Sequence, residues 1–161
     1  MHNKRIILVG PSASGKEFLK KRFIKRGFIP DVSYTSRPQR PDEIDGTDYH
    51  FVSKNNFEIY RDHNNFYEWA EYRGNFYGTG QEQWDHCKIF IMETTGISKI
   101  HPEDRDDCFI IFINPPQDTR IKRMALERKW GWKEITKRLD FDKDCFKDFK
   151  DYDIMITNSD F

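Results

Sequence analysis

The segment Gly10-Pro11-Ser12-Ala13-Ser14-Gly15-Lys16 decides how this chain folds, because it has the pattern of a phosphate-binding loop. It follows the apolar run Ile6-Ile7-Leu8-Val9 and precedes an amphipathic stretch from Glu17 to Arg26, so the order is strand, loop and helix. Glycines at both ends let backbone N–H groups turn toward a phosphate, and the start of the helix adds a favourable partial charge. Lys16 can reach the β- and γ-phosphate oxygens, so we expect a nucleotide-phosphate site here.

Glu17 occupies the position at which the usual motif has a Ser or Thr hydroxyl that binds Mg²⁺. Three roles are open for it. Its carboxylate can bind Mg²⁺ directly or through a water molecule, because carboxylate oxygen is a hard ligand that Mg²⁺ accepts. It can also be only a favourable anion in the first turn of the helix, or its charge can oppose a bound triphosphate and weaken or abolish its use.

The composition limits the partners of this 161-residue chain. Lys+Arg and Asp+Glu both number 27, so the net charge is zero. Nothing in this charge suggests non-specific electrostatic binding to nucleic acid or to an anionic membrane. No N-terminal signal is visible and no apolar stretch has the length of a membrane span, so we expect a single cytoplasmic domain. The three cysteines lack a C-x-x-C pair, which is typical of reduced thiols.

Two further apolar runs, at residues 88–92 and 108–113, have the pattern of buried parallel strands, each followed by a helical segment. With residues 6–9, a short strand near Val32 to Thr35 and a last one at Ile154 to Thr157, they make about five strands separated by helices. This alternation predicts an α/β fold of three layers with a parallel sheet. It also predicts a ligand at the carboxyl ends of the strands.

Two regions break the alternation. Residues 36–80 contain short alternating pieces and one helical stretch, Lys54 to Asp62, which indicates a small mixed β insert that closes on a substrate. A basic helix from Arg120 to Arg138 is interrupted near Lys129-Trp130-Gly131-Trp132, a pattern that suits a lid over phosphates or a solvated face. We therefore expect one domain made of a core at 1–35 and 81–161, an insert at 36–80 and a lid at about 124–140.

Two longer segments carry a more specific pattern. The first is Ser33-Tyr34-Thr35-Ser36-Arg37-Pro38-Gln39-Arg40-Pro41-Asp42-Glu43-Ile44-Asp45-Gly46-Thr47-Asp48-Tyr49-His50-Phe51-Val52, and the second is Phe66-Tyr67-Glu68-Trp69-Ala70-Glu71-Tyr72-Arg73-Gly74-Asn75-Phe76-Tyr77-Gly78-Thr79. Both resemble the monophosphate-binding region of guanylate kinases. With the phosphate loop, residues 111–128 and the ending Thr157-Asn158-Ser159-Asp160-Phe161, the resemblance covers nearly the whole chain. It implies a P-loop kinase fold that transfers a phosphoryl group from ATP to GMP or dGMP with Mg²⁺.

The resemblance implies a clamp for the phosphate of the acceptor nucleotide. It assigns this role to Arg37, Arg40, Tyr49 and Tyr77. The physical chemistry agrees, because two guanidinium forks three residues apart in a Pro-bounded turn can bind a monoester phosphate in a bidentate manner.

The resemblance also assigns the residues that recognise guanine. Glu68 would accept hydrogen bonds from the donors of the guanine edge, with Ser33 and Thr79 as hydroxyl partners, since hydroxyls can serve O6. Glu93 matches the second of two acids that the family has at a strand end and helps to hold the base, whereas Ile91 replaces the first.

On the donor side, the resemblance implies ATP contacts from the loop residues and from two later positions: Gly10, Pro11, Ser12, Ala13, Ser14, Gly15, Lys16, Glu17, Arg123 and Asn158. Lys16, Arg128 and Arg138 would neutralise the charge that spreads over the transferring phosphoryl group, and Glu17 is the expected metal residue. Trp130 and Trp132 are foreign to the family's lid. They can stack on a base, shield the site from water, or pack between lid and core.

Two other functions remain open at this point. One is a guanylate kinase-like binding module with little turnover, which Glu17 and Ile91 favour but Lys16 with both clamp arginines opposes. The other is a kinase of a different phosphorylated acceptor, which Glu68 and Ser33 disfavour. We expect a monomer or homodimer. The sequence ends at Phe161, where relatives add a helix, so we also expect a small or truncated version of the fold.

Overall fold

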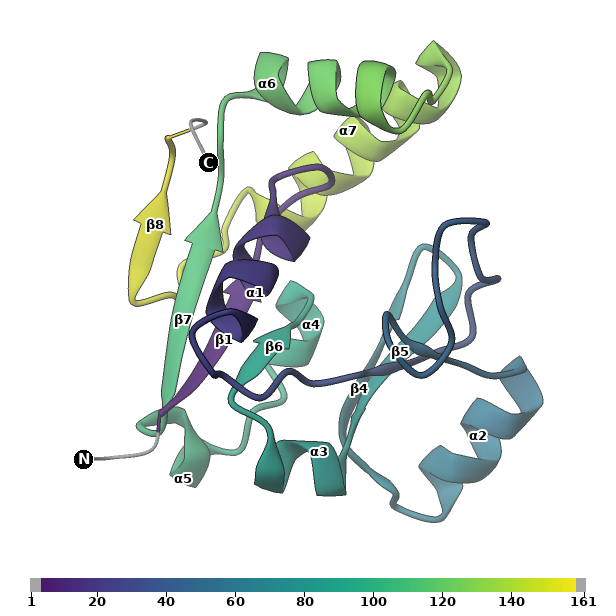
Figure 1. Ribbon diagram of the computed structural model, residues 1–161, viewed down its shortest axis with the longest axis vertical. Coiled ribbons are helices and arrows are strands. Elements are labelled where there is room, and N and C mark those ends of the chain that lie inside the picture. Colours follow the sequence, from purple (N-terminus) through teal and green to yellow (C-terminus); the bar gives the residue numbers. More distant parts are fainter. Residues whose placement is uncertain (1–3, 159–161) are drawn as a thin grey trace.

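The computed structural model describes residues 4–158, and its centre is a parallel sheet of four strands in the order β6-β1-β7-β8 (Figure 1). These strands are β1 (Arg5–Val9), β6 (Ile89–Ile91), β7 (Cys108–Ile113) and β8 (Ile154–Ile156). β1 lies between two partners, with Ile6 opposite Ile89 of β6 and opposite Phe109 of β7. The phosphate loop leaves the carboxyl end of this central strand.

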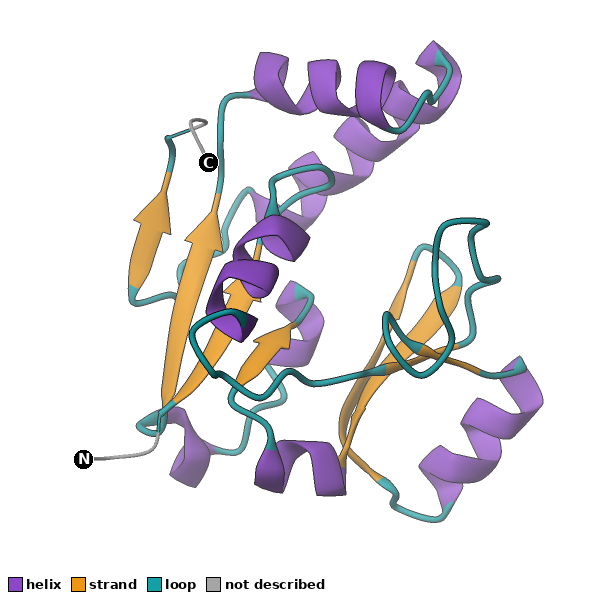
Figure 2. Ribbon diagram, viewed as in Figure 1, coloured by secondary structure: helices purple, strands orange, loops and turns teal. Residues whose placement is uncertain are grey.

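Helices cover both faces of the sheet, which makes the three layers expected from the sequence (Figure 2). On one face, α1 (Lys16–Ile24) packs Phe23 against the buried cluster that contains Leu8. On the other face, the end of α7 (Trp132–Phe146) stacks Phe146 on Phe112 with ring centroids 5.4 Å apart. Both faces are apolar because the strands are continuous apolar runs, and successive side chains of a strand point to opposite sides of the sheet.

A second sheet, in the order β3-β2-β5-β4, forms the mixed insert. Figure 1 labels its strands β4 and β5. Its strands are β2 (Tyr34–Thr35), β3 (His50–Phe51), β4 (Phe66–Tyr72) and β5 (Asn75–Gly80). β2 and β3 pair parallel, and the other pairs are antiparallel. The helix α2 (Lys54–Asp62) packs Phe57 onto this sheet, stacked on Phe66 at 4.5 Å and on Phe76 at 5.3 Å.

The strand expected near Val32 to Thr35 does not join the main sheet. It begins at Tyr34 and belongs to the second sheet, while a single parallel bridge between Pro30 and Ile89 connects this segment to β6. Ile89 pairs with the residues on either side of Pro30, since its N–H donates to the Ile29 carbonyl oxygen and its own carbonyl oxygen accepts from the Asp31 N–H at 2.9 Å. The chain crosses to the second sheet after Asp31. The main sheet therefore has four described strands rather than about five.

The helical region after β7 is interrupted where the sequence predicted. α6 (Gln117–Lys122) continues into a π-helical turn, η1 (Arg123–Glu127), and α7 then begins at Trp132. Between them Lys129 has a positive φ of 54°, a conformation that no helix interior contains. Three short helices connect the remaining strands: α3 (Gln81–His86), α4 (Thr94–Ile97) and α5 (Pro102–Arg105).

Over residues 4–158, no helix is long and apolar enough to cross a membrane. The three cysteines Cys87, Cys108 and Cys145 are free thiols. Burial raises the pKa of Cys108 to about 11, so this thiol stays protonated at neutral pH.

Candidate functional site

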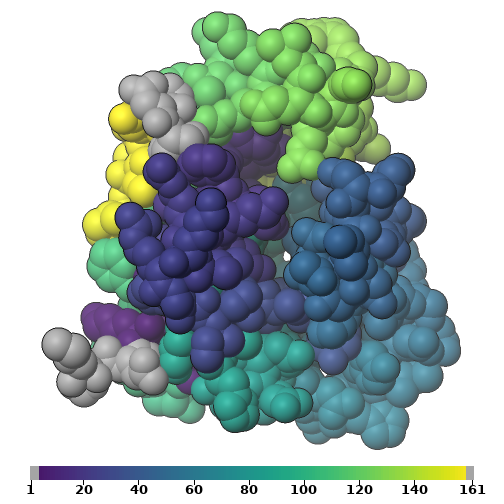
Figure 3. All heavy atoms as spheres, in the orientation of Figure 1, coloured from purple at the N-terminus to yellow at the C-terminus, as the bar shows by residue number. Residues whose placement is uncertain are grey.

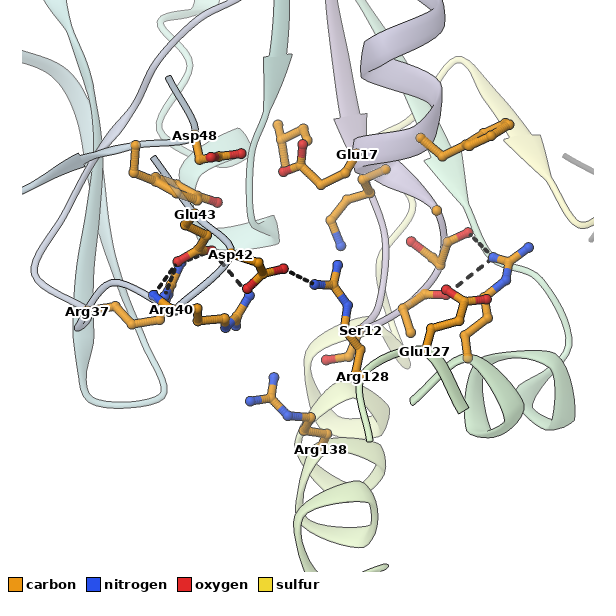
Figure 4. A pocket seen from close by; sticks show the side chains of 18 of the residues that line it. Ser12, Glu17, Arg37, Arg40, Asp42, Glu43, Asp48, Glu127, Arg128 and Arg138 are labelled. Carbon is orange, nitrogen blue, oxygen red and sulfur yellow. Dashed lines mark hydrogen bonds and ion pairs between the residues drawn. The ribbon is translucent and has the colours of Figure 1, made fainter. Parts of the chain in front are cut away.

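A cleft of about 550 Å³ lies at the end of β1, between the two sheets and below the lid helices. Figure 3 shows this recess between the purple residues that follow β1 and the blue residues of the second sheet. Figure 4 shows Arg37 and Arg40 on one wall, Glu17 on the opposite wall and Arg138 on the lid. The cleft is therefore at the carboxyl ends of the parallel strands, where ligands of α/β folds bind.

The phosphate loop makes a tight turn that depends on its glycines. A Cβ on Gly10 would lie 2.2 Å from the carbonyl oxygen of Ile113, so no larger residue fits there. Gly15 has a φ of 106°, in the left-handed region that favours glycine. Lys16 Nζ donates hydrogen bonds to the carbonyl oxygens of Gly10 and, at 3.1 Å, of Pro11. The ammonium group lies within its own loop and must turn outward to reach a phosphate.

A buried carboxylate on α7, Asp142, holds the loop from its other side. It is 2% exposed and accepts hydrogen bonds from the backbone N–H of Ser12 at 2.9 Å and from the Ser12 hydroxyl at 3.1 Å. Arg120 donates to the same carboxylate at 3.0 Å, and the Tyr72 hydroxyl donates to it at 3.2 Å. The phosphate loop, α6, α7 and β4 thus meet at one side chain. Sequence reasoning missed Asp142, because an acid in the charged run 140–144 looks like part of a solvated helix face.

The two clamp arginines are paired with an acid in this structure. Arg37 binds Glu43 in a bidentate manner, at 2.7 and 2.9 Å, while Arg40 donates its backbone N–H at 2.8 Å and its guanidinium at 3.4 Å (Figure 4). Burial opposes ionisation of Glu43, but the hydrogen bonds from both arginines lower its pKa overall. Tyr49 and Tyr77 line the same part of the cleft. Sequence reasoning missed Glu43, although an acid three residues after Arg40 was a usable signal.

A smaller cavity of about 30 Å³ lies between the second sheet and β6, and Ser33 and Glu68 line it. Glu68 is 7% exposed, and burial raises its pKa to about 7. The Thr79 hydroxyl donates to Glu68 Oε1 at 2.8 Å. A Cβ on Gly96 would lie 2.8 Å from Glu68 Oε2, so this glycine makes room for the carboxylate. The fold thus brings together Ser33, Glu68 and Thr79.

Both lid arginines line the cleft. Arg128 lies 3.9 Å from Asp42 of the second sheet's loop, and the guanidinium of Arg138 lies 3.9 Å from the centre of the Trp130 ring (Figure 4). Trp130 therefore lines the site. Trp132 is 67% exposed, so it does not pack between lid and core.

Arg123 and Asn158, both expected at ATP, lie in different surroundings. Arg123 lines the cleft and donates hydrogen bonds to the carbonyl oxygens of Ala13 at 3.3 Å and Ser14 at 3.0 Å. Asn158 follows β8 and is exposed, and it is not among the described residues that line the cleft. The last three residues of the C-terminal segment, 159–161, lie outside the described residues.

Two carboxylates line the cleft near the phosphate loop. Glu17 lies in the first turn of α1, and Glu93 precedes α4 and lines both cavities. Burial raises the pKa of Glu93, and the charge of Lys16 opposes that shift. Within residues 4–158, no group of three or more His, Cys, Asp or Glu side chains is placed to hold a metal ion. One or two carboxylates together with substrate phosphates are the ligands that Mg²⁺ commonly uses, so these residues fit that ion only with a nucleotide present.

The chain is similar to guanylate kinases in sequence and in structure. The family model described as "Guanylate kinase" matches residues 2–161. The guanylate kinase of Agrobacterium fabrum is 32% identical, over 96% of this chain and 74% of that protein, and the one of Nostoc sp. is 34% identical, over 100% and 85%. The crystal structure of guanylate kinase from Anaplasma phagocytophilum matches with a TM-score of 0.73 and 25% identity, over 98% of this chain and 77% of that one.

Proposed function

Since the chain belongs to the guanylate kinase family, we propose that it transfers the γ-phosphoryl group of ATP to GMP or dGMP, giving ADP and the nucleoside diphosphate. One structural observation carries this proposal. The cleft has a phosphate loop on one wall and an arginine clamp on the other, so two phosphorylated ligands can meet between them. A binding module without turnover does not need both walls, and the relatives give it no support.

We assign the donor phosphates to the phosphate loop. The backbone N–H groups of residues 10–17 and the Lys16 ammonium would bind the β- and γ-phosphates after Lys16 leaves the Gly10 carbonyl oxygen. Arg123 supports the backbone of this loop, and Asn158 is the least supported ATP contact because it is not among the described residues of the cleft.

We assign Mg²⁺ to the region between the loop and the nucleotide phosphates, with Glu17 as its protein ligand. When bound, Mg²⁺ neutralises charge on the β- and γ-phosphate oxygens. Two other roles stay open for Glu17: a favourable anion at the start of α1, or a charge that opposes the triphosphate. Substitution of Glu17 by Gln and by Ser separates these roles from metal binding.

We assign the acceptor nucleotide to the opposite wall. Arg37, Arg40, Tyr49 and Tyr77 would bind its phosphate, and that phosphate must compete with Glu43 for both guanidinium groups. The competition favours a dianionic phosphate over a weaker anion, because only strong charge-assisted hydrogen bonds can replace an existing bidentate pair.

The polar edge of the guanine base would enter the smaller cavity, which shares Tyr49, Tyr77 and Glu93 with the cleft. We refer to this cavity, lined by Ser33 and Glu68, as the base pocket. Glu68, once ionised, accepts hydrogen bonds from the N1–H and 2-amino groups, which adenine lacks in that arrangement. Ser33, Thr79 and Glu93 complete the surroundings of the base edge.

The lid would act on the transferring group. Arg128 and Arg138 neutralise charge as it spreads over the phosphoryl oxygens, while the acceptor phosphate, which is already anionic, attacks in line without a general base. We further propose one domain with a core at 1–35 and 81–161, an insert at 36–80 and a lid at about 124–140, except that β2 (Tyr34–Thr35) pairs within the sheet of the insert. We also propose a cytoplasmic enzyme, monomeric or homodimeric, without a nucleic-acid partner. The balanced charge of the chain supports the last of these points.

A coupled assay of ADP release tests the function directly. With ATP and Mg²⁺, GMP or dGMP should be turned over faster than AMP, UMP or dTMP, by a factor on the order of 10⁴, because a wrong base leaves buried hydrogen-bonding groups unpaired. Equal or faster turnover of AMP or dTMP would contradict the proposal.

A further inference from the structure

Asp31 is a buried carboxyl group beside the base pocket, and none of the roles above uses it. It is 1% exposed, and one of its oxygens, Oδ2, accepts the hydrogen bond that the Ser33 hydroxyl donates. Its other oxygen, Oδ1, has no hydrogen-bond partner within the described part of the chain. The nearby ammonium of Lys20 binds the backbone carbonyl oxygen of Asp31, at 2.7 Å. A buried carboxylate with so few donors is an unfavourable arrangement unless it serves a purpose.

The direction of the Ser33 hydrogen bond is opposite to the one that guanine needs. An ionised Asp31 can only accept, so Ser33 directs its single proton toward Asp31 and presents only oxygen lone pairs to the base pocket. O6 of guanine is also an acceptor and needs a donor. Thr79 is not available for it, because its hydroxyl donates to Glu68. A protonated Asp31 would instead donate to Ser33 Oγ and leave the Ser33 proton for O6.

We infer that Asp31 is a positioning residue of the acceptor site, which takes up a proton when guanine binds and thereby turns Ser33 into a donor to O6. The inference rests on the proposed function, since it concerns the binding of GMP. Through the hydrogen bond between Asp31 and Ser33, the protonation of Asp31 becomes part of base recognition, although Asp31 itself does not touch the base.

Four titratable or charged groups face Asp31 from the surrounding elements: Lys20 of α1, His50 of β3, Glu68 of β4 and Cys87 before β6. Burial raises the pKa of Asp31 to about 6, against the lowering effects of Ser33, Lys20 and His50. Burial also raises the pKa of Glu68 to about 7, and the charge of Asp31 adds to that shift. The thiol of Cys87 has a raised pKa, first through burial, and stays protonated.

These pKa values give the sign of the pH dependence. Above pH 7 both acids of the free protein are largely ionised, so a proton must be taken up with GMP, and its affinity should fall about tenfold per pH unit. Below pH 6 Asp31 is already protonated, while Glu68 must lose its proton to accept the guanine donors. Affinity for GMP should therefore also fall on the acid side, and the two acids together place the optimum near neutral pH.

Calorimetric titration of GMP at pH 8, in two buffers of different ionisation enthalpy, measures the proton uptake. The phosphate of GMP is fully ionised at that pH, because its second pKa is about 6. We expect uptake of about one proton per GMP by the parent protein. Asp31→Asn should abolish the uptake and bind GMP about 10- to 100-fold more tightly at pH 8, because its amide N–H₂ donates to Ser33 at every pH. The matched control Asp148→Asn, at an exposed position after α7, should keep the parental uptake and affinity.

Each result decides between the inference and the proposed function. GMP binding without proton uptake in the parent, or a parental pH profile in Asp31→Asn, overturns the role of Asp31 and leaves the kinase function intact. If Asp31→Asn does not fold, the proton uptake of the parent protein on GMP binding, measured in the two buffers, tests the role of Asp31 by itself. Absence of GMP binding at every pH overturns the proposed function, and the inference with it.

Discussion

Glu17 lies in the first turn of α1 and lines the cleft, where the usual phosphate loop has a hydroxyl. If it is the Mg²⁺ ligand, Glu17→Gln should raise the Mg²⁺ concentration for half-maximal rate by at least about tenfold, since even an outer-shell partner of a metal is worth that much. Glu17→Ser should be at least as active as the parent, because serine restores the hydroxyl. Steady-state rates over a Mg²⁺ titration measure both effects.

The control for this prediction is Glu82→Gln, which removes an exposed first-turn acid from α3 and should leave the Mg²⁺ dependence unchanged. An inactive parent that gains turnover on Glu17→Ser would show that the charge opposes the triphosphate. An unchanged Mg²⁺ dependence in both Glu17 variants would make Glu17 a helix-start residue only. The metal would then be held by substrate phosphates and Glu93.

Single residues also mark the limit of what the sequence could predict. Lys16, Arg37, Arg40 and Glu68 stand in specific local patterns, and the structure places the first three at the cleft and Glu68 in the adjoining base pocket. Asp142 could not be selected, because only the tertiary fold brings α7 against the phosphate loop. Local sequence patterns predict how residues close along the chain are arranged, whereas a buried ion pair depends on segments that are distant along the chain.

Between elements, Asp142 is the main polar connection of α7 to the phosphate loop. Asp142→Ala would leave the buried guanidinium of Arg120 without its carboxylate and the Ser12 N–H without its acceptor. Breaking a buried pair in this way costs about 3–5 kcal/mol in the free energy of unfolding, which urea titration can measure. Asp140→Ala, at an exposed position of the same helix, should change stability by less than about 0.5 kcal/mol.

A loss for Asp142→Ala as small as that of Asp140→Ala would mean that solvent or a rearranged side chain satisfies Arg120. The connection between α7 and the loop would then be packing alone. The stacked ring pair of Phe112 and Phe146 holds α7 against β7 of the main sheet and would be unaffected.

Elements were predictable where hydrophobic periodicity decides them. α2 has the bounds expected from the sequence, Lys54–Asp62, and the interruption of the lid helix falls at the expected residues. The expectation of a fifth strand in the main sheet was wrong, because the apolar residues of this segment indicate an extended chain and do not indicate which sheet it joins. The pairing with β6 ends after Asp31, and Tyr34 then pairs with Gly78 of β5.

For the molecule as a whole, two ligands that bind opposite walls should each stabilise the fold. ATP or GMP at about 100 times its Kd should add about 2.7 kcal/mol, and raise Tm by about 5–10 °C for a chain of this length. Lys16→Ala should lose the shift with ATP and keep the shift with GMP. Arg40→Ala should do the reverse, since loss of a charge-assisted contact weakens GMP binding by about 1.5–3 kcal/mol.

Thermal unfolding followed by circular dichroism measures these shifts, and Arg26→Ala, at an exposed position after α1, is the matched control. Loss of the ATP shift in Arg40→Ala would place that arginine at the donor or in the fold. A variant that loses both shifts would indicate that the two walls fold as one binding unit.

The strand order has a consequence for how the protein emerges from the ribosome. β1 is made first and lies at the centre of the main sheet, but its partners arrive much later, since Ile6 pairs with Ile89 and Phe109. The second sheet is built from β2 to β5, which are close together in the chain, so its loop-closure entropy is smaller and its contacts can form sooner. During synthesis the acceptor wall can therefore be complete while β1 is still an unpaired apolar strand, and that strand is the segment on which chaperones would act.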